Sequence, residues 1–137
     1  FWKKIGSKVD IMDAKQHDYI LSITSHIPHL VAYNIVSTSI NIQEKKQSAI
    51  IKYSAGGLRD FTRIAASNPI MWRDIFIQNK KNTSKEIKKF IANLEDLKNA
   101  IENEDGKKLE EIFIKTKKIR KEIIKAGQDV SKPDFGR

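Results

Sequence analysis

The stretch Ser25-His26-Ile27-Pro28-His29 places a proline inside a run that otherwise has the pattern of a long apolar helix. Proline in a helix interior costs roughly 3 kcal/mol, because it lacks an N–H group and clashes with the preceding turn. We therefore predict a long helix kinked at Pro28. The four-residue spacing puts Ser25 and His29 on one face of that helix, with the kink between them.

Working outward, Asp13 is a suitable N-cap for this helix, which we predict to run to about Asn41. Its apolar positions form too wide a stripe for a half-exposed helix, so we expect burial on most sides, centrally or against a second subunit. These positions are Ile20, Leu21, Ile23, Ile27, Leu30, Val31 and Ile35.

Two further clusters follow, Gly56-Gly57-Leu58-Arg59-Asp60-Phe61-Thr62-Arg63 and Asn68-Pro69-Ile70-Met71-Trp72. The paired glycines predict a turn in which the backbone approaches something closely or takes positive φ. A short helix is expected to begin at Asp60 or its neighbours. Pro69 suits the first turn of the next helix, which carries Trp72.

Two amphipathic helices complete the predicted domain, separated by Gly106 and forming an antiparallel hairpin. The last residues, from Gly127 to Arg137, have the composition of a frayed tail. The expected architecture is all-α, with five or six helices and no internal repeat. The two apolar stripes are Ile87, Phe90, Ile91, Leu94, Leu97 and Ile101, and Leu109, Ile112, Phe113, Thr116, Ile119 and Ile123.

The first dozen residues differ from the rest. Trp2 to Ile5 predict a short helix ended by Gly6, and Lys8 to Met12 alternate as a strand does. A strand with no partner in the sequence, in a chain that starts without methionine, suggests the end of a preceding domain. We therefore expect that end at 1–13, a helical domain at 14–127 and a tail at 128–137.

The net charge of +9 raises the possibility of nucleic-acid binding, but lysines make up 21 of the 26 basic residues. Nucleic-acid readers usually concentrate arginine and interleave aromatic residues, whereas Lys115 to Lys125 contain no aromatic residue. Solvated helix faces, or a positive field that attracts a small anion, explain the charge better. We expect no nucleic-acid partner.

Other features exclude whole classes of function. Zero cysteines rule out disulfides, thiol catalysis and thiolate metal sites. No apolar run approaches the length of a membrane span, and no secretory signal follows Phe1, so we expect a cytoplasmic protein without a membrane partner. Neither G-x-G-x-x-G, G-x-S-x-G nor a phosphate loop is present. The chain by itself shows no complete catalytic apparatus.

Each candidate site residue has a structural alternative. His26 and His29 would need a third ligand to hold a metal, and none is well spaced, so we expect no metal and the packing of one histidine in the core. Arg63 lies beside an apolar patch and should have an anionic partner, either Asp60, Asp74 or a ligand. Trp72 fits the core or a ligand-binding wall.

Taken in order, His17-Asp18, Ser25 to His29, Gly56 to Arg63 and Asn68 to Asp74 resemble the motifs of the prephenate dehydrogenase family. In that family an N-terminal Rossmann domain is joined to a helical domain that dimerises and completes the active site. The resemblance implies an intertwined dimerisation domain of the 6-phosphogluconate-dehydrogenase C-terminal-like type. It also makes residues 1–12 similar to the end of the nucleotide domain.

The resemblance implies oxidative decarboxylation of prephenate or arogenate with NAD or NADP, within tyrosine biosynthesis. The catalytic histidine is then expected in the N-terminal domain, so that this chain alone is inactive and supplies substrate recognition. Arg63 would clamp a carboxylate, Ser25 and His29 would hydrogen-bond the substrate, Gly56 would allow a close backbone approach, and Trp72 would form a wall. Feedback inhibition by tyrosine is left open.

Two other functions remain open from the sequence. One is the helical dimerisation domain of another β-hydroxyacid-type dehydrogenase, which would not need the Ser25, His29 and Arg63 combination. The other is a non-catalytic basic helical module.

Overall fold

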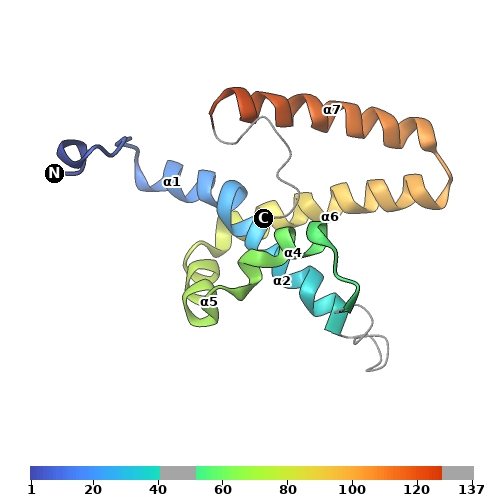
Figure 1. Cartoon of the computed structure of the whole chain (residues 1–137), viewed down its shortest axis with the longest axis horizontal. Helices are drawn as coiled ribbons and strands as arrows, with labels where there is room; N and C mark the ends of the chain where they lie inside the picture. Colours follow the sequence, from blue (N-terminus) through green and yellow to red (C-terminus); the bar gives the residue numbers. More distant parts are fainter. Residues whose placement is uncertain (41–51, 128–137) are drawn as a thin grey trace.

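The computed structural model describes residues 1–40 and 52–127, and every regular element within these ranges is a helix (Figure 1). When α1, η2 and α2 are counted as one interrupted helix, the described residues form five α-helices, which confirms the all-α prediction. The elements are η1 (Trp2–Ile5), α1 (Ala14–Leu21), η2 (Ser22–His26), α2 (Ile27–Ile40), α4 (Gly56–Thr62), η3 (Arg63–Ala66), α5 (Pro69–Gln78), α6 (Lys80–Glu102) and α7 (Gly106–Lys125).

The long first helix begins as predicted. Asp13 caps α1, its carboxylate accepting from the backbone N–H of Gln16 at 3.0 Å. The interruption is a π turn, η2, which closes with the N–H of Ile27 donating to the carbonyl of Ser22. A widened turn directly before Pro28 gives the proline ring room against the preceding carbonyls, so the helix continues past it. The end predicted near Asn41 lies outside the described residues.

The prediction of a glycine turn at Gly56 and Gly57 was wrong. Both residues open helix α4, and neither has positive φ. A Cβ on Gly57 would meet nothing within 4 Å, and on Gly56 it would meet only the Arg59 side chain, at 3.8 Å. Glycine permits unusual backbone geometry but does not require it, and here it adopts the helix. The short helix therefore starts at Gly56, earlier than the start that we expected at Asp60 or its neighbours.

The N-terminal segment is partly as predicted. Residues Trp2–Ile5 form a 3-10 turn, and Gly6 ends it with a φ of 88°. The expected strand at Lys8 to Met12 is absent, and the described residues contain no strand with which it could pair. A strand needs a hydrogen-bonded neighbour, so the alternating pattern alone could not form one. Figure 1 shows η1 projecting away from the other helices.

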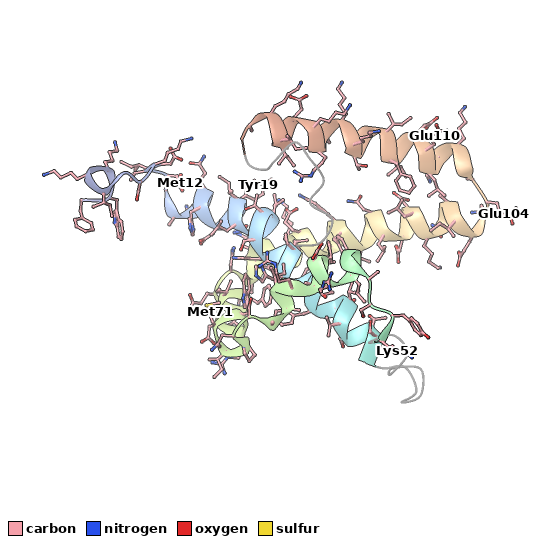
Figure 2. The ribbon with its side chains drawn as sticks, in the orientation of Figure 1. Met12, Tyr19, Lys52, Met71, Glu104 and Glu110 are labelled. Atoms are coloured by element: carbon pink, nitrogen blue, oxygen red, sulfur yellow. The ribbon has the colours of Figure 1, made fainter. Side chains whose placement is uncertain are left out.

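Helices α6 and α7 form the predicted antiparallel hairpin. Asp105 caps α7 by accepting from the N–H of Lys108 at 3.0 Å. Glu104, just before it, adopts the left-handed backbone conformation with a φ of 54°. Figure 2 shows Glu104 at the turn between the two helices. An apolar groove of about 500 Å³ lies along the hairpin. It is lined by Leu94, Leu97, Lys98, Ile101, Glu102, Leu109 and Phe113.

The chain buries little apolar surface by itself. Its accessible surface is 11876 Å², whereas a monomeric protein of this mass exposes about 7,300 Å². Among the described residues only Ala32, Trp72 and Ala100 are buried hydrophobic residues. Many large apolar side chains of α6 and α7 are about half exposed or more, including Leu94, Ile101, Phe113, Ile114 and Ile119.

The most enclosed contact is polar. Within 1–40 and 52–127, five polar or charged residues are buried, and all lie where η2 meets the loop before α6 or the first turns of α6. Glu86 in this group is paired with the ammonium of Lys89, at 2.8 Å and 3.0 Å from its two oxygens. The five residues are Ser22, His26, Asn79, Thr83 and Glu86.

Candidate functional site

His29 and Trp72 form the centre of the candidate site. Their rings are stacked, with centroids 3.6 Å apart and planes inclined by 23°. The Nδ1 atom of His29 lies 2.9 Å from the carbonyl oxygen of Ser25. A carbonyl only accepts, so we assign the proton to Nδ1 in this contact, which turns Nε2 away from the helix backbone. The predicted shared face of Ser25 and His29 is therefore present.

The segment that follows α4 is held against this face of α2. The Tyr33 hydroxyl, one turn beyond His29, donates to the carbonyl of Ser67 at 3.1 Å. Ser67 directly follows η3, and both η3 and α4 pack on α2. Asn68 then caps α5 by accepting from the N–H groups of Ile70 and Met71. Two contacts, at Tyr33 and at His29, thus fix the path of the chain from η3 to Trp72.

Arg63 is the first residue of η3, on the segment that these contacts hold. Its side chain is exposed, and it forms no ion pair with any described residue. Asp74, one of the two expected structural partners, instead bonds the guanidinium of its neighbour Arg73 at 2.8 Å. Asp60 pairs with nothing in the described ranges. The alternative of a structural carboxylate partner is therefore wrong within these ranges, and the cation is available to a ligand.

The other predicted site residues are placed as follows. Ser25 is half-buried, and its hydroxyl has no hydrogen-bond partner among the described residues. Gly56 lies at the start of α4, which packs on α2, and a Cβ there would meet only the Arg59 side chain. The structure thus joins Ser25, His29 and Trp72 directly, and attaches Arg63 and Gly56 through the packing of their elements.

Trp72 belongs to the core as well as to the site. Only 6% of its surface is exposed, so the core alternative is confirmed. Its indole Nε1–H is buried without a hydrogen-bond partner in the described part of the chain. Buried indole N–H groups usually have an acceptor, so this donor stands out among the described residues.

His26 is the histidine that packs in the core, as we expected of one of the two, but its partners were not predicted. It is buried, its Nδ1 lies 3.3 Å from the amide nitrogen of Asn79 and 3.4 Å from the hydroxyl of Thr83. Its ring meets Trp72 and Phe76 edge-on, each with a centroid separation of 6.2 Å. Burial lowers the pKa of His26, since desolvation disfavours the charged imidazolium. The available sequence signal was the three-residue spacing, which puts His26 and His29 on neighbouring positions of one helix face, where both rings reach Trp72.

The described residues hold no group of three or more His, Cys, Asp or Glu side chains arranged to bind a metal ion. None of the helices in the described ranges is both long enough and apolar enough to cross a membrane.

Comparison with known proteins identifies the family. The family described as "Prephenate dehydrogenase, dimerization domain" matches residues 13–115. The chain is 39% identical over 120 residues to the cyclohexadienyl dehydrogenase of Zymomonas mobilis, covering 88% of this chain and 41% of that protein. It is 35% identical over 109 residues to the prephenate dehydrogenase of Bacillus subtilis, covering 80% and 29%.

Solved structures agree. A prephenate dehydrogenase from A. aeolicus, in complex with hydroxyphenyl propionate and NAD+, superposes with a TM-score of 0.80 and 42% identity. The match covers 89% of this chain and 42% of that one. Synechocystis arogenate dehydrogenase, at 19% identity, shares the fold with a TM-score of 0.79. The chain spans about two fifths or less of the length of the curated relatives it matches. On the match of residues 13–115, the chain belongs to the prephenate dehydrogenase dimerization-domain family.

Proposed function

We propose that this chain is the substrate-binding and dimerising part of a dehydrogenase that converts prephenate to 4-hydroxyphenylpyruvate. The observation that carries the proposal is the stack of His29 on Trp72, together with the attachment to α2 of the segment that carries Arg63. Arg63 has no ion-pair partner among the described residues. A cation, an imidazole, a hydroxyl and an aromatic wall suit a small ligand that carries carboxylates and a ring.

Arg63 would bind a carboxylate of the substrate, because the planar guanidinium can donate two parallel hydrogen bonds to it. Ser25 would donate through its free hydroxyl. His29, with Nδ1 held by the Ser25 carbonyl, would present Nε2 to a polar group of the substrate. The net charge of +9 would help gather a dianionic substrate.

The reaction is an oxidative decarboxylation. A hydride leaves C4 of prephenate, the ring carboxylate departs as carbon dioxide, and the ring becomes aromatic. Because aromatisation supplies the driving force, the chain's own residues mainly orient the substrate. The group that polarises the C4 hydroxyl is proposed to be a histidine of a preceding Rossmann domain, of which residues 1–13 would be the end.

The hydride acceptor is proposed to be NAD or NADP, which supplies the oxidising nicotinamide ring. The described residues of this chain contain no strand followed by a glycine-rich helix start, the element that holds a dinucleotide pyrophosphate. They therefore do not fit the cofactor themselves, and we assign its binding mainly to the Rossmann domain. The A. aeolicus relative solved with NAD+ is more than twice the length that this chain covers.

We also propose that the domain forms a homodimer. Its surface exceeds that of a monomer of its mass, and no described residue fills the apolar groove between α6 and α7. A second copy would cover this groove and the half-exposed apolar residues beside it, which agrees with the dimerization domain named for the family.

The first experiment compares prephenate with arogenate as substrates of the full-length protein, with NAD and with NADP, by the absorbance of the reduced nicotinamide. Turnover of prephenate supports the proposal. Turnover of arogenate alone would replace it with arogenate dehydrogenation. Turnover of neither substrate with either cofactor would contradict it.

A further inference from the structure

The two histidines of Ser25-His26-Ile27-Pro28-His29 contact the same indole from different sides. His29 stacks on the ring of Trp72 at 3.6 Å, while His26 meets it edge-on at 6.2 Å with an interplanar angle of 84°. Trp72 thus connects His29, which is only partly buried, with His26, which is buried. The orientation of the His29 ring depends on where this indole lies.

His26 is itself fixed by α6. The Asn79 amide nitrogen donates to the carbonyl of Asp18 at 2.7 Å, which sets the orientation of that amide. The oxygen of the same Asn79 amide accepts from the amide nitrogen of Asn82 at 2.9 Å. Because the nitrogen that faces His26 can only donate, we assign Nδ1 of His26 as an acceptor and place its proton on Nε2. His26 therefore has one defined tautomer and one defined ring plane.

The packing around His26 favours the same neutral state. Trp72 and Phe76 of α5 present aromatic rings to it, and Thr83 of α6 presents a hydroxyl. The charged or titratable groups that act on it are Asp18, His17 and His29; the carboxylate raises its pKa and the two histidines lower it, each less than burial does. No carboxylate among the described residues bonds to its ring.

We propose that His26 is a positioning residue, which orients the indole of Trp72 and through it the ligand-facing ring of His29. The inference rests on the proposed function for its kinetic consequence, since it assumes that His29 contacts the substrate. It does not rest on that function for its structural consequence, the geometry of the stack of His29 on Trp72.

Two variants test the ring of His26 and its hydrogen-bond acceptor separately. His26→Asn keeps an acceptor near the Nδ1 position but removes the ring. His26→Phe keeps a ring against Trp72 and Phe76 but removes the acceptor. His17→Asn is the matched control, because His17 is exposed and its side chain bonds only its neighbour Asp18 among the described residues.

The kinetic readout is KM for prephenate in the full-length protein. We expect His26→Asn to raise KM about tenfold with kcat within about twofold, because a misplaced binding group weakens substrate binding. His26→Phe should stay within about threefold of the unaltered protein in KM. A merely structural role would lower the active fraction, and so kcat, without raising KM, and that result would overturn the proposal.

The second readout needs no substrate. The chain has two tryptophans, Trp2 and Trp72, so Trp2→Phe in a full-length protein with its other tryptophans replaced makes Trp72 the fluorophore. Contact with the stacked His29 ring affects indole emission at fixed pH, so the emission of Trp72 should be kept in His26→Phe and changed in His26→Asn. Unchanged emission in His26→Asn would overturn the proposal. If His26→Asn does not fold, changed emission in His26→Phe would overturn it.

The two readouts distinguish the possible failures. Absence of prephenate turnover in the unaltered protein, with the fluorescence results as expected, would overturn the proposed function and leave the positioning of Trp72 by His26 supported.

Discussion

The imidazole of His29 lies almost flat on the indole of Trp72, although the two residues belong to helices α2 and α5 and are separated by the whole of α4 and η3. One turn further along α2, the Tyr33 hydroxyl bonds the carbonyl of Ser67, in the segment between η3 and α5. Because both contacts fix the segment that begins with Arg63, the stack and the cation belong to one candidate site.

Replacing Arg63 should weaken substrate binding specifically. We predict that Arg63→Ala in the full-length protein raises KM for prephenate about tenfold to a hundredfold, since charge-assisted hydrogen bonds to a carboxylate are lost. Cofactor binding should be unchanged. Steady-state kinetics with varied prephenate and varied cofactor measure both effects.

Arg73→Ala is the matched control for this variant. Arg73 is also an exposed arginine, but its guanidinium already bonds Asp74. Its KM should stay within about twofold of the unaltered value. Equal effects of the two substitutions would remove Arg63 from the site.

Substitution in the apolar groove should weaken the dimer. Phe113 lines the groove and is 55% exposed in the single chain. Phe113→Lys would place a charge against the partner's apolar surface, and we predict that the dissociation constant rises about tenfold or more. Sedimentation velocity over a range of protein concentrations measures it.

The control adds a lysine to the same helix outside the groove. Glu110→Lys, next to the groove residue Leu109, should leave the sedimentation coefficient unchanged (Figure 2 labels Glu110). A dimer that survives Phe113→Lys with the same affinity would show that the groove is not the contact surface.

The free energy of unfolding should decrease at acid pH because of His26. Burial lowers its pKa in the folded state, so the unfolded chain binds more protons and the free energy of unfolding decreases as pH falls below the ordinary value of about 6.5. Urea unfolding at fixed protein concentration between pH 7.5 and pH 5.5 is expected to show this loss (the pH range is chosen to be about one unit either side of that value).

The same loss should be smaller in His26→Phe, which cannot take up the proton. His17→Asn should keep most of the pH dependence, because burial lowers the pKa of His26 more than the nearby His17 does. Identical pH profiles for the unaltered protein and His26→Phe would contradict the assignment of this effect to His26.

The cap of α5 should matter for both stability and the site. Asn68→Ala removes an acceptor for two backbone N–H groups in the turn that leads to Trp72. We predict a loss of about 1 kcal/mol in the free energy of unfolding. The comparison is Asn34→Ala, at an exposed position that caps no helix, which should lose nothing. Equal urea midpoints for the two variants would argue against the cap.

Local sequence signals predicted the parts of the fold that depend on local interactions. Asp13 and Pro69 were correctly placed at helix starts because capping and the fixed φ of proline act within one turn. Gly56 was misassigned because glycine fits both a turn and a helix start, and only packing on α2 decides between them.

The shared helix face of two candidate residues was predictable from the sequence, but their tertiary contacts were not. Helical spacing placed Ser25 and His29 together, whereas the stack of His29 on Trp72 depends on tertiary packing between α2 and α5. The partners of His26 were not predicted, because Asn79 and Thr83 lie more than fifty positions along the chain.

The most direct test of the account is calorimetric titration of the full-length protein with prephenate, tyrosine and 4-hydroxyphenylpyruvate, beside Arg63→Ala and Arg73→Ala. The account predicts that prephenate binds to the unaltered protein and to Arg73→Ala, and that its affinity falls about tenfold or more in Arg63→Ala. Equal prephenate affinity in all three proteins would contradict the placement of the substrate site at His29, Trp72 and Arg63.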